Sequence, residues 1–370
     1  MMNAAVGRAH LKTGLALLLG ATHTDRLIRF MSGSRRLPLI VGYHRVVDDG
    51  RVRRASIIAP MLVSRRMFER QLDWIGRRFR FVSLDEVGSR LESGRAFPTP
   101  TATITFDDGY RDMYEHAYPV LKRKGIPAAV FMVTDWIDRT TPLYHDRLYL
   151  LLTRDWPIAR EVLVDLGVVT AEQVASSRAI GEPFGALRFL LTNLCQEELG
   201  HVVAALEERL AIDTERLHGL KPLTWAMLAE MQRGGITVGS HTRTHALLTR
   251  ESSARMLEEL AGARHALEDR LRTPIKHFAY PDGAFNSEAV DAVAQAGYRF
   301  AYTTCHHRDR RHPLLTIPRC VLWENSCLDP AGRFSAAVAS CVTSGVFHFA
   351  SGCRHRHEAT SVPAVSLVRG

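Results

Sequence analysis

The chain has 370 residues, of which 46% are hydrophobic and 24% charged, and its formal net charge is +9. This composition is typical of a soluble globular protein with one large domain or two ordinary ones. The positive charge suits nucleic acid, an anionic membrane or an acidic substrate. Because the sequence contains no zinc finger, RNA-recognition signature or base-reading basic helix, we do not expect nucleic acid as a partner.

The six cysteines form no C-x-x-C pair and lie mostly in the last third of the chain. Their spacing does not resemble a disulfide framework, so we expect reduced thiols, as in a cytoplasmic protein. The run Cys305-His306-His307 has ligand-type residues, but its charged, turn-like neighbours argue against a metal cluster there.

The N-terminal segment carries the apolar stretch LALLLGA (15–21) after several basic residues. It is too short to span a bilayer, and no small-x-small cleavage site follows it. We interpret residues 1–36 as an amphipathic helix on an anionic membrane surface, followed by a linker; a signal peptide is the alternative. We accordingly expect a cytoplasmic protein, peripheral at the inner membrane, rather than a secreted or periplasmic one.

From residue 37 onward, short apolar runs alternate six or seven times with helical patterns. The predicted strands are 37–43, 101–106, 127–134, 236–240, 275–280, 298–304 and 314–323, and the predicted helices are 83–93, 114–125, 224–235, 251–271 and 287–297. Such alternation predicts a parallel sheet with helical crossovers, either an open doubly wound sheet or a closed barrel. No phosphate-binding glycine motif follows a strand, which argues against a nucleotide-binding fold.

Residues 138–222 interrupt this alternation with helical patterns and no clear strand. We predict a helical insertion in a loop of a core domain that spans residues 37–330. A loop of that length is usually a functional lid or binding wall, and the alternative is a cap that only supports the core. Residues 331–370 are less periodic and are interpreted as a C-terminal tail.

Two aspartates, Asp107 and Asp108, end the apolar strand 101–106 and precede Gly109. An Asp-Gly turn at a strand end explains this arrangement when it is taken alone. On an extended strand, however, neighbouring side chains point to opposite faces. One carboxylate can therefore bind a cation while the other stays free as a base.

Other polar residues also lie just beyond predicted strands, namely His44, His241, His245 and Asp282. In parallel β/α folds the carboxyl ends of the strands converge on the active site, so we expect these side chains to lie together. Two histidines and one carboxylate leave open positions on a divalent cation, as catalytic metal sites do.

The segments TFDDGY (105–110), SHTRTH (240–245) and YPDG (280–283) resemble the first three motifs of the polysaccharide deacetylase family, carbohydrate esterase family 4, with its NodB homology domain. The resemblance covers about residues 38–325 and is interrupted by the helical insertion. It implies an α/β fold, a distorted (β/α)7 barrel with the insertion after the third strand. It also implies metal-dependent removal of acetyl groups from an N-acetylated sugar.

Carried over by position, the resemblance implies that Asp107 is the general base and that Asp108, His241 and His245 bind the metal ion. Zinc is the expected metal, with Co²⁺, Ni²⁺ or Mn²⁺ as alternatives.

The third motif departs from the family pattern. The family usually has an arginine that orients the base and an aromatic residue whose backbone N–H serves the oxyanion; here Ala279 and Asp282 occupy these positions. The Asp282 N–H can still serve the oxyanion, because a backbone donor survives side-chain replacement. The missing arginine leaves open which group tunes Asp107.

The late motif that carries a catalytic histidine has only a faint match in GVFHFA (345–350), at His348. Some family members resemble circularly permuted versions, in which a Tyr-His pair on the first strand supplies this histidine. We therefore expect His44 rather than His348 to act as the general acid, because an imidazole can be charged near neutral pH.

The sequence thus predicts a metal-dependent N-deacetylase acting on an amino sugar of a bacterial-type cell-surface or exopolysaccharide glycan, or of its lipid-linked precursor. The alternatives are an O-acetyl esterase of the same fold and a non-catalytic glycan-binding relative. A binding protein needs no general base, so the paired aspartates and histidines favour an enzyme. Neither the sugar nor the oligomeric state follows from the sequence.

Overall fold

The structure is a computed structural model of the chain. It describes residues 37–48, 58–170, 172–173, 180–217, 219–346 and 357, together with residues 13, 14, 16 and 18. Most of the helix and linker predicted for 1–36 lie outside the described residues, as does the tail between 347 and 356 with His348.

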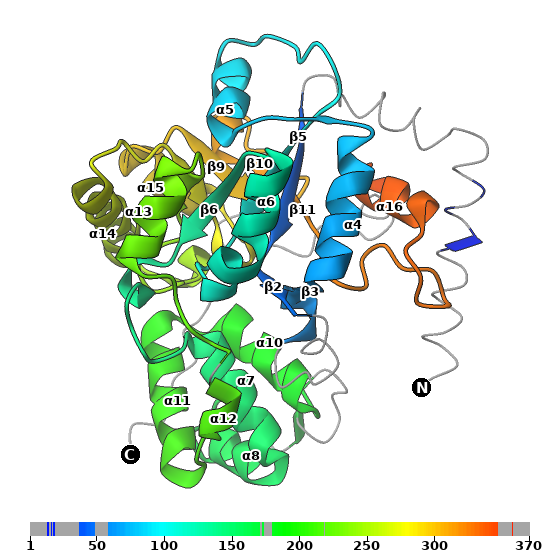
Figure 1. The fold of residues 1–370 in the computed structure, drawn as a ribbon. Coiled ribbons are helices and arrows are strands. Elements are labelled where there is room, and N and C mark those ends of the chain that lie inside the picture. The colour runs from blue at the N-terminus through cyan, green and yellow to red at the C-terminus, as the bar shows by residue number, and fades with distance from the viewer. Residues whose placement is uncertain are drawn as a thin grey trace.

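The core is a barrel of parallel strands (Figure 1). In chain order these are β1 (Leu39–Tyr43), β5 (Thr101–Phe106), β6 (Ala128–Met132), β7 (Thr237–Ser240), β8 (His277–Ala279), β9 (Phe300–Thr303), β10 (Ile317–Pro318) and β11 (Cys320–Val321). They pair in the order β10-β9-β8-β7-β6-β5-β1-β11, and every ladder is parallel. A short ninth strand, β4 (Arg80–Phe81), pairs in parallel with β5 outside this path. All six residues of β5 are buried, as its apolar and β-branched composition predicts.

A single extended segment closes the barrel. β10 pairs with β9 and β11 pairs with β1, and only Arg319 separates these two strands. The Arg319 N–H donates to the Thr303 carbonyl at 2.7 Å, and the Leu322 N–H donates to the Gly42 carbonyl at 2.9 Å. Since β10 and β11 share one position, the described strands form seven positions around the barrel. The predicted (β/α)7 barrel is confirmed, and the open doubly wound alternative is wrong.

Helices cover the outside of the barrel, and serine or threonine caps begin most of them. They are α4 (Arg65–Gly76), α5 (Leu84–Glu92), α6 (Tyr118–Lys124), α13 (Trp225–Arg233), α14 (Ser253–Leu271) and α15 (Ser287–Gln295). Ser64, Ser83, Thr224 and Ser252 each accept a hydrogen bond from the backbone N–H three residues later. These bonds satisfy donors that the first helical turn leaves unpaired.

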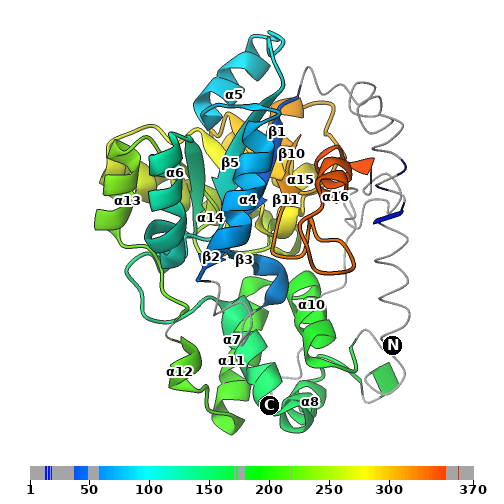
Figure 2. The same ribbon diagram turned by 45° about the vertical axis from the view of Figure 1, so that its right-hand side comes forward.

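Sequence analysis did not identify four elements outside the barrel sheet. They are α4, α16 (Ala336–Thr343) and a parallel pair formed by β2 (Arg45–Val47) and β3 (Leu62–Ser64). In α4, the buried side chains of Phe68, Leu72 and Ile75 have helical spacing, but arginines obscure the pattern. Figure 2 shows α16 on the outside of the barrel, beside α4.

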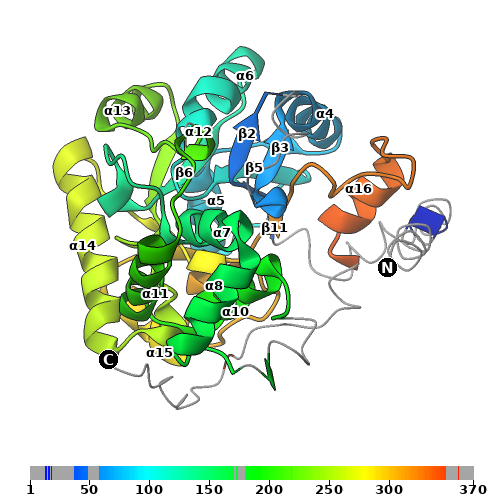
Figure 3. The same cartoon turned by 90° about the horizontal axis from the view of Figure 1, so that it is seen from below.

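The helical insertion follows β6, the third barrel strand. Its helices are α7 (Tyr144–Arg154), α8 (Trp156–Asp165), α10 (Pro183–Asn193), α11 (Gln196–Arg209) and α12 (Thr214–Leu217). They pack around an apolar core of their own, which includes Leu148, Leu190 and Val202 and is separate from the barrel core. Figures 1 and 3 show the insertion across one end of the barrel.

The described part of the N-terminal segment contacts α16. Ala16 is fully buried against Val338 and Cys341, whereas the side chain of Leu18 is 62% exposed. Among the described residues, no helix has both the length and the apolar character needed to cross a membrane.

Candidate active site

The residues singled out by the sequence lie at the carboxyl ends of the barrel strands. They are His44 after β1, Asp107 and Asp108 after β5, His241 and His245 after β7, and Asp282 after β8. The insertion that follows β6 lies at this same end of the barrel (Figure 3). The structure thus brings together side chains from four strand ends, as the parallel topology requires.

Asp108, His241 and His245 form a three-residue ligand set. Asp108 Oδ1 lies 3.5 Å from His241 Nε2 and 3.3 Å from His245 Nε2, and the three ligand atoms all lie within 4.8 Å of one another. Both carboxylate oxygens of Asp108 are buried without a hydrogen-bond partner. A buried carboxylate left without donors is costly unless a cation or another charge compensates it, so these residues fit a divalent metal ion.

The pKa shifts of Asp108 and His241 suit metal binding, whereas the pKa of His245, which burial alone would lower, is raised by the Asp108 carboxylate. Burial alone would raise the pKa of Asp108, but the His245 imidazole, 3.3 Å away, outweighs burial and holds that pKa well below its usual range. Burial lowers the pKa of His241 to about 4. His241 Nδ1 lies 2.7 Å from the Ala279 carbonyl, which only accepts, so Nδ1 carries the proton and Nε2 is left as the ligand atom.

The backbone of the site adopts conformations that non-glycine residues rarely adopt. The site residues and one neighbour with positive φ are Asp108 (70°), Thr242 (68°), His245 (68°) and Asp282 (54°). Asp282 lies in a short 3-10 turn, Pro281–Gly283, directly after β8. Such conformations persist only where the surrounding structure enforces them, and they concentrate at functional sites.

Glu259 of α14 holds the loop between the two histidines. Its side chain is fully buried, and Oε2 accepts hydrogen bonds from the backbone N–H groups of Arg243 and Thr244, both at 2.9 Å. Oε1 accepts a third from the Thr244 hydroxyl at 2.8 Å. The carboxylate therefore fixes the strained turn that places both imidazoles on Asp108. Nothing in the local sequence distinguished Glu259 from its exposed neighbour Glu258.

Asp107 has a different environment from the adjacent Asp108. The Arg319 guanidinium donates to both carboxylate oxygens of Asp107 at 2.7 Å, and both side chains are buried. Burial would raise the pKa of Asp107, but the Arg319 charge outweighs it and lowers the pKa. The arginine that the motif at Ala279 lacks is thus supplied by the closing strand. The question that the motif left open, which group tunes Asp107, is answered by Arg319.

His44 also lies near Asp107. Its Nε2 is 4.0 Å from Asp107 Oδ2, and its side chain is 23% exposed. The preceding Tyr43 is fully buried in the barrel core, so the strand end presents the imidazole toward the site. His348, the alternative acid, lies outside the described residues.

The insertion contributes a buried polar network behind the ligand set. His145 of α7 packs its ring against His245 with centroids 4.9 Å apart, and its Nε2 contacts the Tyr110 hydroxyl at 2.8 Å. That hydroxyl donates to Asp146 at 2.6 Å. Burial lowers the pKa of His145 to about 3 and raises that of Asp146 to about 6. Since Tyr110 gives its one proton to Asp146, neutral His145 donates its Nε2–H to Tyr110.

Arg45 ties this network to the barrel. Its guanidinium lies over the Tyr110 ring, 4.6 Å from the centroid, and its Nε pairs with Asp112 at 2.7 Å. It also donates to the Gly219 carbonyl, near the C-terminal end of the insertion. The first and last parts of the insertion are therefore both joined to the barrel by buried polar contacts, beside the candidate site.

A family model described as polysaccharide deacetylase matches residues 94–179 and 182–301, more than half of the chain. The chain belongs to the polysaccharide deacetylase family. The resemblance drawn from the three motifs is confirmed. The match includes the aspartate pair and both histidines, but it begins after His44 and ends before Arg319.

Relatives and solved structures agree with this assignment. Bacillus subtilis (strain 168) YxkH, provisionally named a polysaccharide deacetylase, is 20% identical over 270 residues, 73% of this chain and 64% of that protein. A Staphylococcus aureus (strain N315) poly-beta-1,6-N-acetyl-D-glucosamine N-deacetylase is 38% identical over 73 residues, 20% of this chain and 25% of that protein. The chain thus spans less than two thirds of the length of these curated relatives.

Two solved structures share the fold. The Streptococcus pyogenes deacetylase PplD in complex with acetate aligns with a TM-score of 0.50 at 19% identity, covering 80% of this chain and 95% of that one. IcaB from Ammonifex degensii aligns with a TM-score of 0.50 at 20% identity, covering 82% and 97%. At these identities the likeness supports the barrel architecture alone.

Substitution of Glu259 by glutamine should weaken metal binding. The amide nitrogen of glutamine cannot accept a hydrogen bond, so part of the loop between the histidines loses its acceptor. We expect about a tenfold to hundredfold loss of metal affinity, as for other groups that orient metal ligands. Titration of the protein against a chromophoric zinc chelator measures this affinity directly.

The matched control is Glu258→Gln, because among the described residues the exposed Glu258 carboxylate pairs with the half-buried side chains of Arg243 and Arg255 and with no backbone group of the loop. It should bind metal as the wild type does. Equal metal affinities for Glu258→Gln and Glu259→Gln would contradict the role assigned to Glu259.

Replacement of Arg319 by methionine should destabilise the fold and raise the pKa of Asp107. It leaves a buried carboxylate uncompensated, which costs about 3–5 kcal/mol at neutral pH. Because the folded pKa of Asp107 is lowered, the stabilisation by the pair is complete above the unfolded pKa of about 4. It decreases as the pH falls from there through the folded pKa.

Urea unfolding of wild type and Arg319→Met across this pH range checks the expectation. The difference in unfolding free energy should be largest at neutral pH and should shrink in acid. The double variant Arg319→Met, Asp107→Asn should be more stable than Arg319→Met at neutral pH. A pH-independent difference would show that Arg319 acts through packing alone.

Proposed function

We propose that the chain is a metal-dependent N-deacetylase that removes acetyl groups from an amino sugar. The substrate class is a cell-surface or exopolysaccharide glycan or its lipid-linked precursor. One observation carries the proposal: two adjacent aspartates have opposite surroundings. Asp108 faces two histidines, and Asp107 faces a buried arginine and lies 4.0 Å from His44. Such a division gives one carboxylate to a cation and leaves the other as a base.

The ligand set would be Asp108, His241 and His245, and we propose zinc as the metal, because two imidazoles and one carboxylate with open positions suit catalytic zinc. A divalent cation at such a site lowers the pKa of a water molecule and polarises a carbonyl group. The name of the Staphylococcus aureus relative supports an N-acetylglucosamine polymer as the substrate, although that match covers a short segment.

The other residues of the site perform the proton transfers. Asp107 accepts a proton from the water that attacks the acetyl carbonyl, and Arg319 holds its two oxygens in place and keeps it ionised. The Asp282 N–H serves the developing oxyanion. When the carbon–nitrogen bond breaks, His44 gives a proton to the departing amine, so acetate and a free amino sugar result. A non-catalytic binder would need none of the Asp107, Arg319 and His44 arrangement.

The direct test is incubation of the protein with N-acetylated glucosamine oligosaccharides and with O-acetylated sugars, followed by mass spectrometry. Loss of acetyl groups from nitrogen, abolished by a chelator and restored by zinc, is the expected result. Loss of acetyl groups from oxygen atoms alone would overturn the N-deacetylase assignment.

Variants of the two aspartates should separate metal binding from turnover. Asp108→Asn and His245→Ala should lose both metal and activity, because each removes a ligand. Asp107→Asn should retain metal and lose turnover, because it removes only the base. Metal content by mass spectrometry and activity are measured on the same preparations. Full metal occupancy in His245→Ala would exclude the proposed ligand set.

The acid is tested by His44→Ala, which should bind metal normally and lose a factor of about 10²–10⁴ in turnover. His201→Ala, which changes an exposed histidine of the insertion, is the matched control and should retain full turnover. An assay in which His348→Ala is impaired and His44→Ala is not would transfer the acid role to His348.

A further inference from the structure

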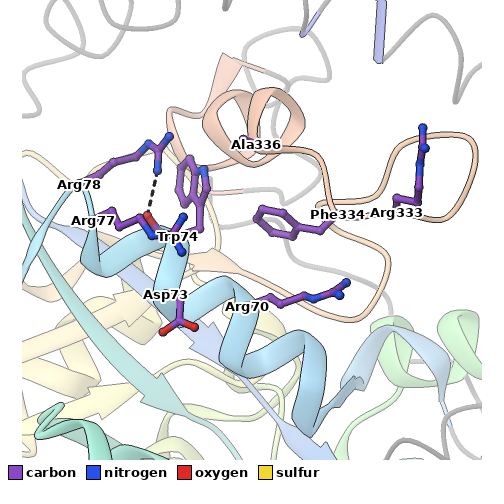
Figure 4. Close-up of a pocket in the computed structure, with 8 residues that line it drawn as sticks. All are labelled: Arg70, Asp73, Trp74, Arg77, Arg78, Arg333, Phe334 and Ala336. Carbon is purple, nitrogen blue, oxygen red and sulfur yellow. Dashed lines mark hydrogen bonds between the residues drawn. The ribbon is translucent and has the colours of Figure 1, made fainter.

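A cavity lies on the outside of the barrel, away from the candidate active site, between the C-terminal part of α4 and the loop before α16 (Figure 4). Its volume is about 570 Å³, and we call it the arginine pocket. It is lined chiefly by Arg70, Trp74, Arg77, Arg78, Arg333 and Phe334. Its described lining contains no residue of the candidate active site, so it is not a subsite for the acetylated sugar.

The charges around the arginine pocket are unbalanced. The carboxylates of Glu69 and Asp73, both on α4, pair with basic residues of the neighbouring helix α6 at 3.0 and 2.5 Å. Arg333 has an ion pair within its own loop at 3.2 Å. For Arg70 and Arg77, both exposed, the described residues provide no ion-pair partner. The pocket therefore presents positive charge that its own acidic neighbours do not neutralise.

Trp74 gives the pocket a second feature that points to a ligand. Its side chain is only 5% exposed, yet its Nε1–H is buried with no hydrogen-bond partner among the described residues. A buried unsatisfied donor costs about 1–3 kcal/mol. The Arg78 guanidinium stacks over the indole, 4.4 Å from its centroid. Figure 4 shows Trp74 on α4 across from the loop that carries Phe334. An anion with several acceptor oxygens would pair with the guanidinium groups that line this pocket.

The surroundings favour a membrane as the source of that anion. Arg65 and Arg66 add exposed positive charge at the start of α4. On the other side, α16 holds the N-terminal segment through Ala16, and Leu18 exposes a large apolar side chain. Basic side chains and exposed apolar side chains are the two features by which protein surfaces bind anionic lipid headgroups and insert apolar groups between them.

We propose that the arginine pocket binds phosphate headgroups and attaches this protein to an anionic membrane through the outer face of α4 and α16. This attachment is independent of the deacetylase chemistry, because it uses none of the catalytic residues.

The test is flotation of the full chain with vesicles of phosphatidylglycerol and phosphatidylcholine, and with phosphatidylcholine alone. The wild type should float only with the anionic vesicles, and less at high salt. The combined variant Arg70→Gln, Arg77→Gln, Arg78→Gln should partition on the order of a hundredfold more weakly, since each basic residue at such a surface contributes to binding. Thermal melting of the variant confirms that it is folded.

The matched control removes the same charge from the insertion, with Arg154→Gln, Arg160→Gln and Arg209→Gln, all exposed in the structure. It should float as the wild type does. Equal losses of vesicle binding in both triple variants would show a general charge effect and overturn the proposal. A wild type that fails to float, but whose melting temperature inorganic phosphate raises through these three arginines, would show a soluble phosphate ligand instead. That result would also overturn it.

Discussion

The buried ion pair between Asp107 and Arg319 joins the closure of the barrel to the ionisation of its candidate base. Arg319 is the one residue between β10 and β11, where the last strand exchanges its partner β9 for β1. Its guanidinium also donates to the Thr105 hydroxyl at 3.2 Å and lies over the Phe131 ring. A buried arginine at this point is stable only with a carboxylate beside it, and a buried Asp107 is ionised only with the arginine. Each group therefore depends on the other and on a closed barrel.

Around this pair, the site is built in two layers. The inner layer contains the two aspartates and the histidines after β7, in a backbone with several positive φ angles. The outer layer fixes that backbone and its side chains: Glu259 binds the loop N–H groups, the Ala279 carbonyl orients His241, and His145 packs on His245. The outer groups come from a crossover helix, a neighbouring strand and the insertion, so all three parts of the fold hold the aspartates and histidines of the inner layer in place.

The sequence predicted the structural features that are set by residues close to one another along the chain. Apolar runs and helix caps located the barrel strands and five of the covering helices, and the aspartate pair and the H-x-x-x-H spacing located the ligand set. It did not predict Arg319, because 212 residues separate it from Asp107 and only barrel closure brings them together. Glu259 and His145 were not predicted, for the same reason. Each is unremarkable among its sequence neighbours, and its role arises from what it contacts after folding.

The pairing of β1 also affects how the chain folds. One neighbour, β5, follows it within the first part of the core, but the other, β11, comes near the end of the described chain and after the whole insertion. Contacts between such distant segments form slowly. Until they form, β1 and β9 are the edges of an open sheet, and unpaired edges associate with other chains. The insertion has its own apolar core and can collapse without waiting for closure. Newly made protein would therefore be most prone to aggregation while its last strand is still undocked.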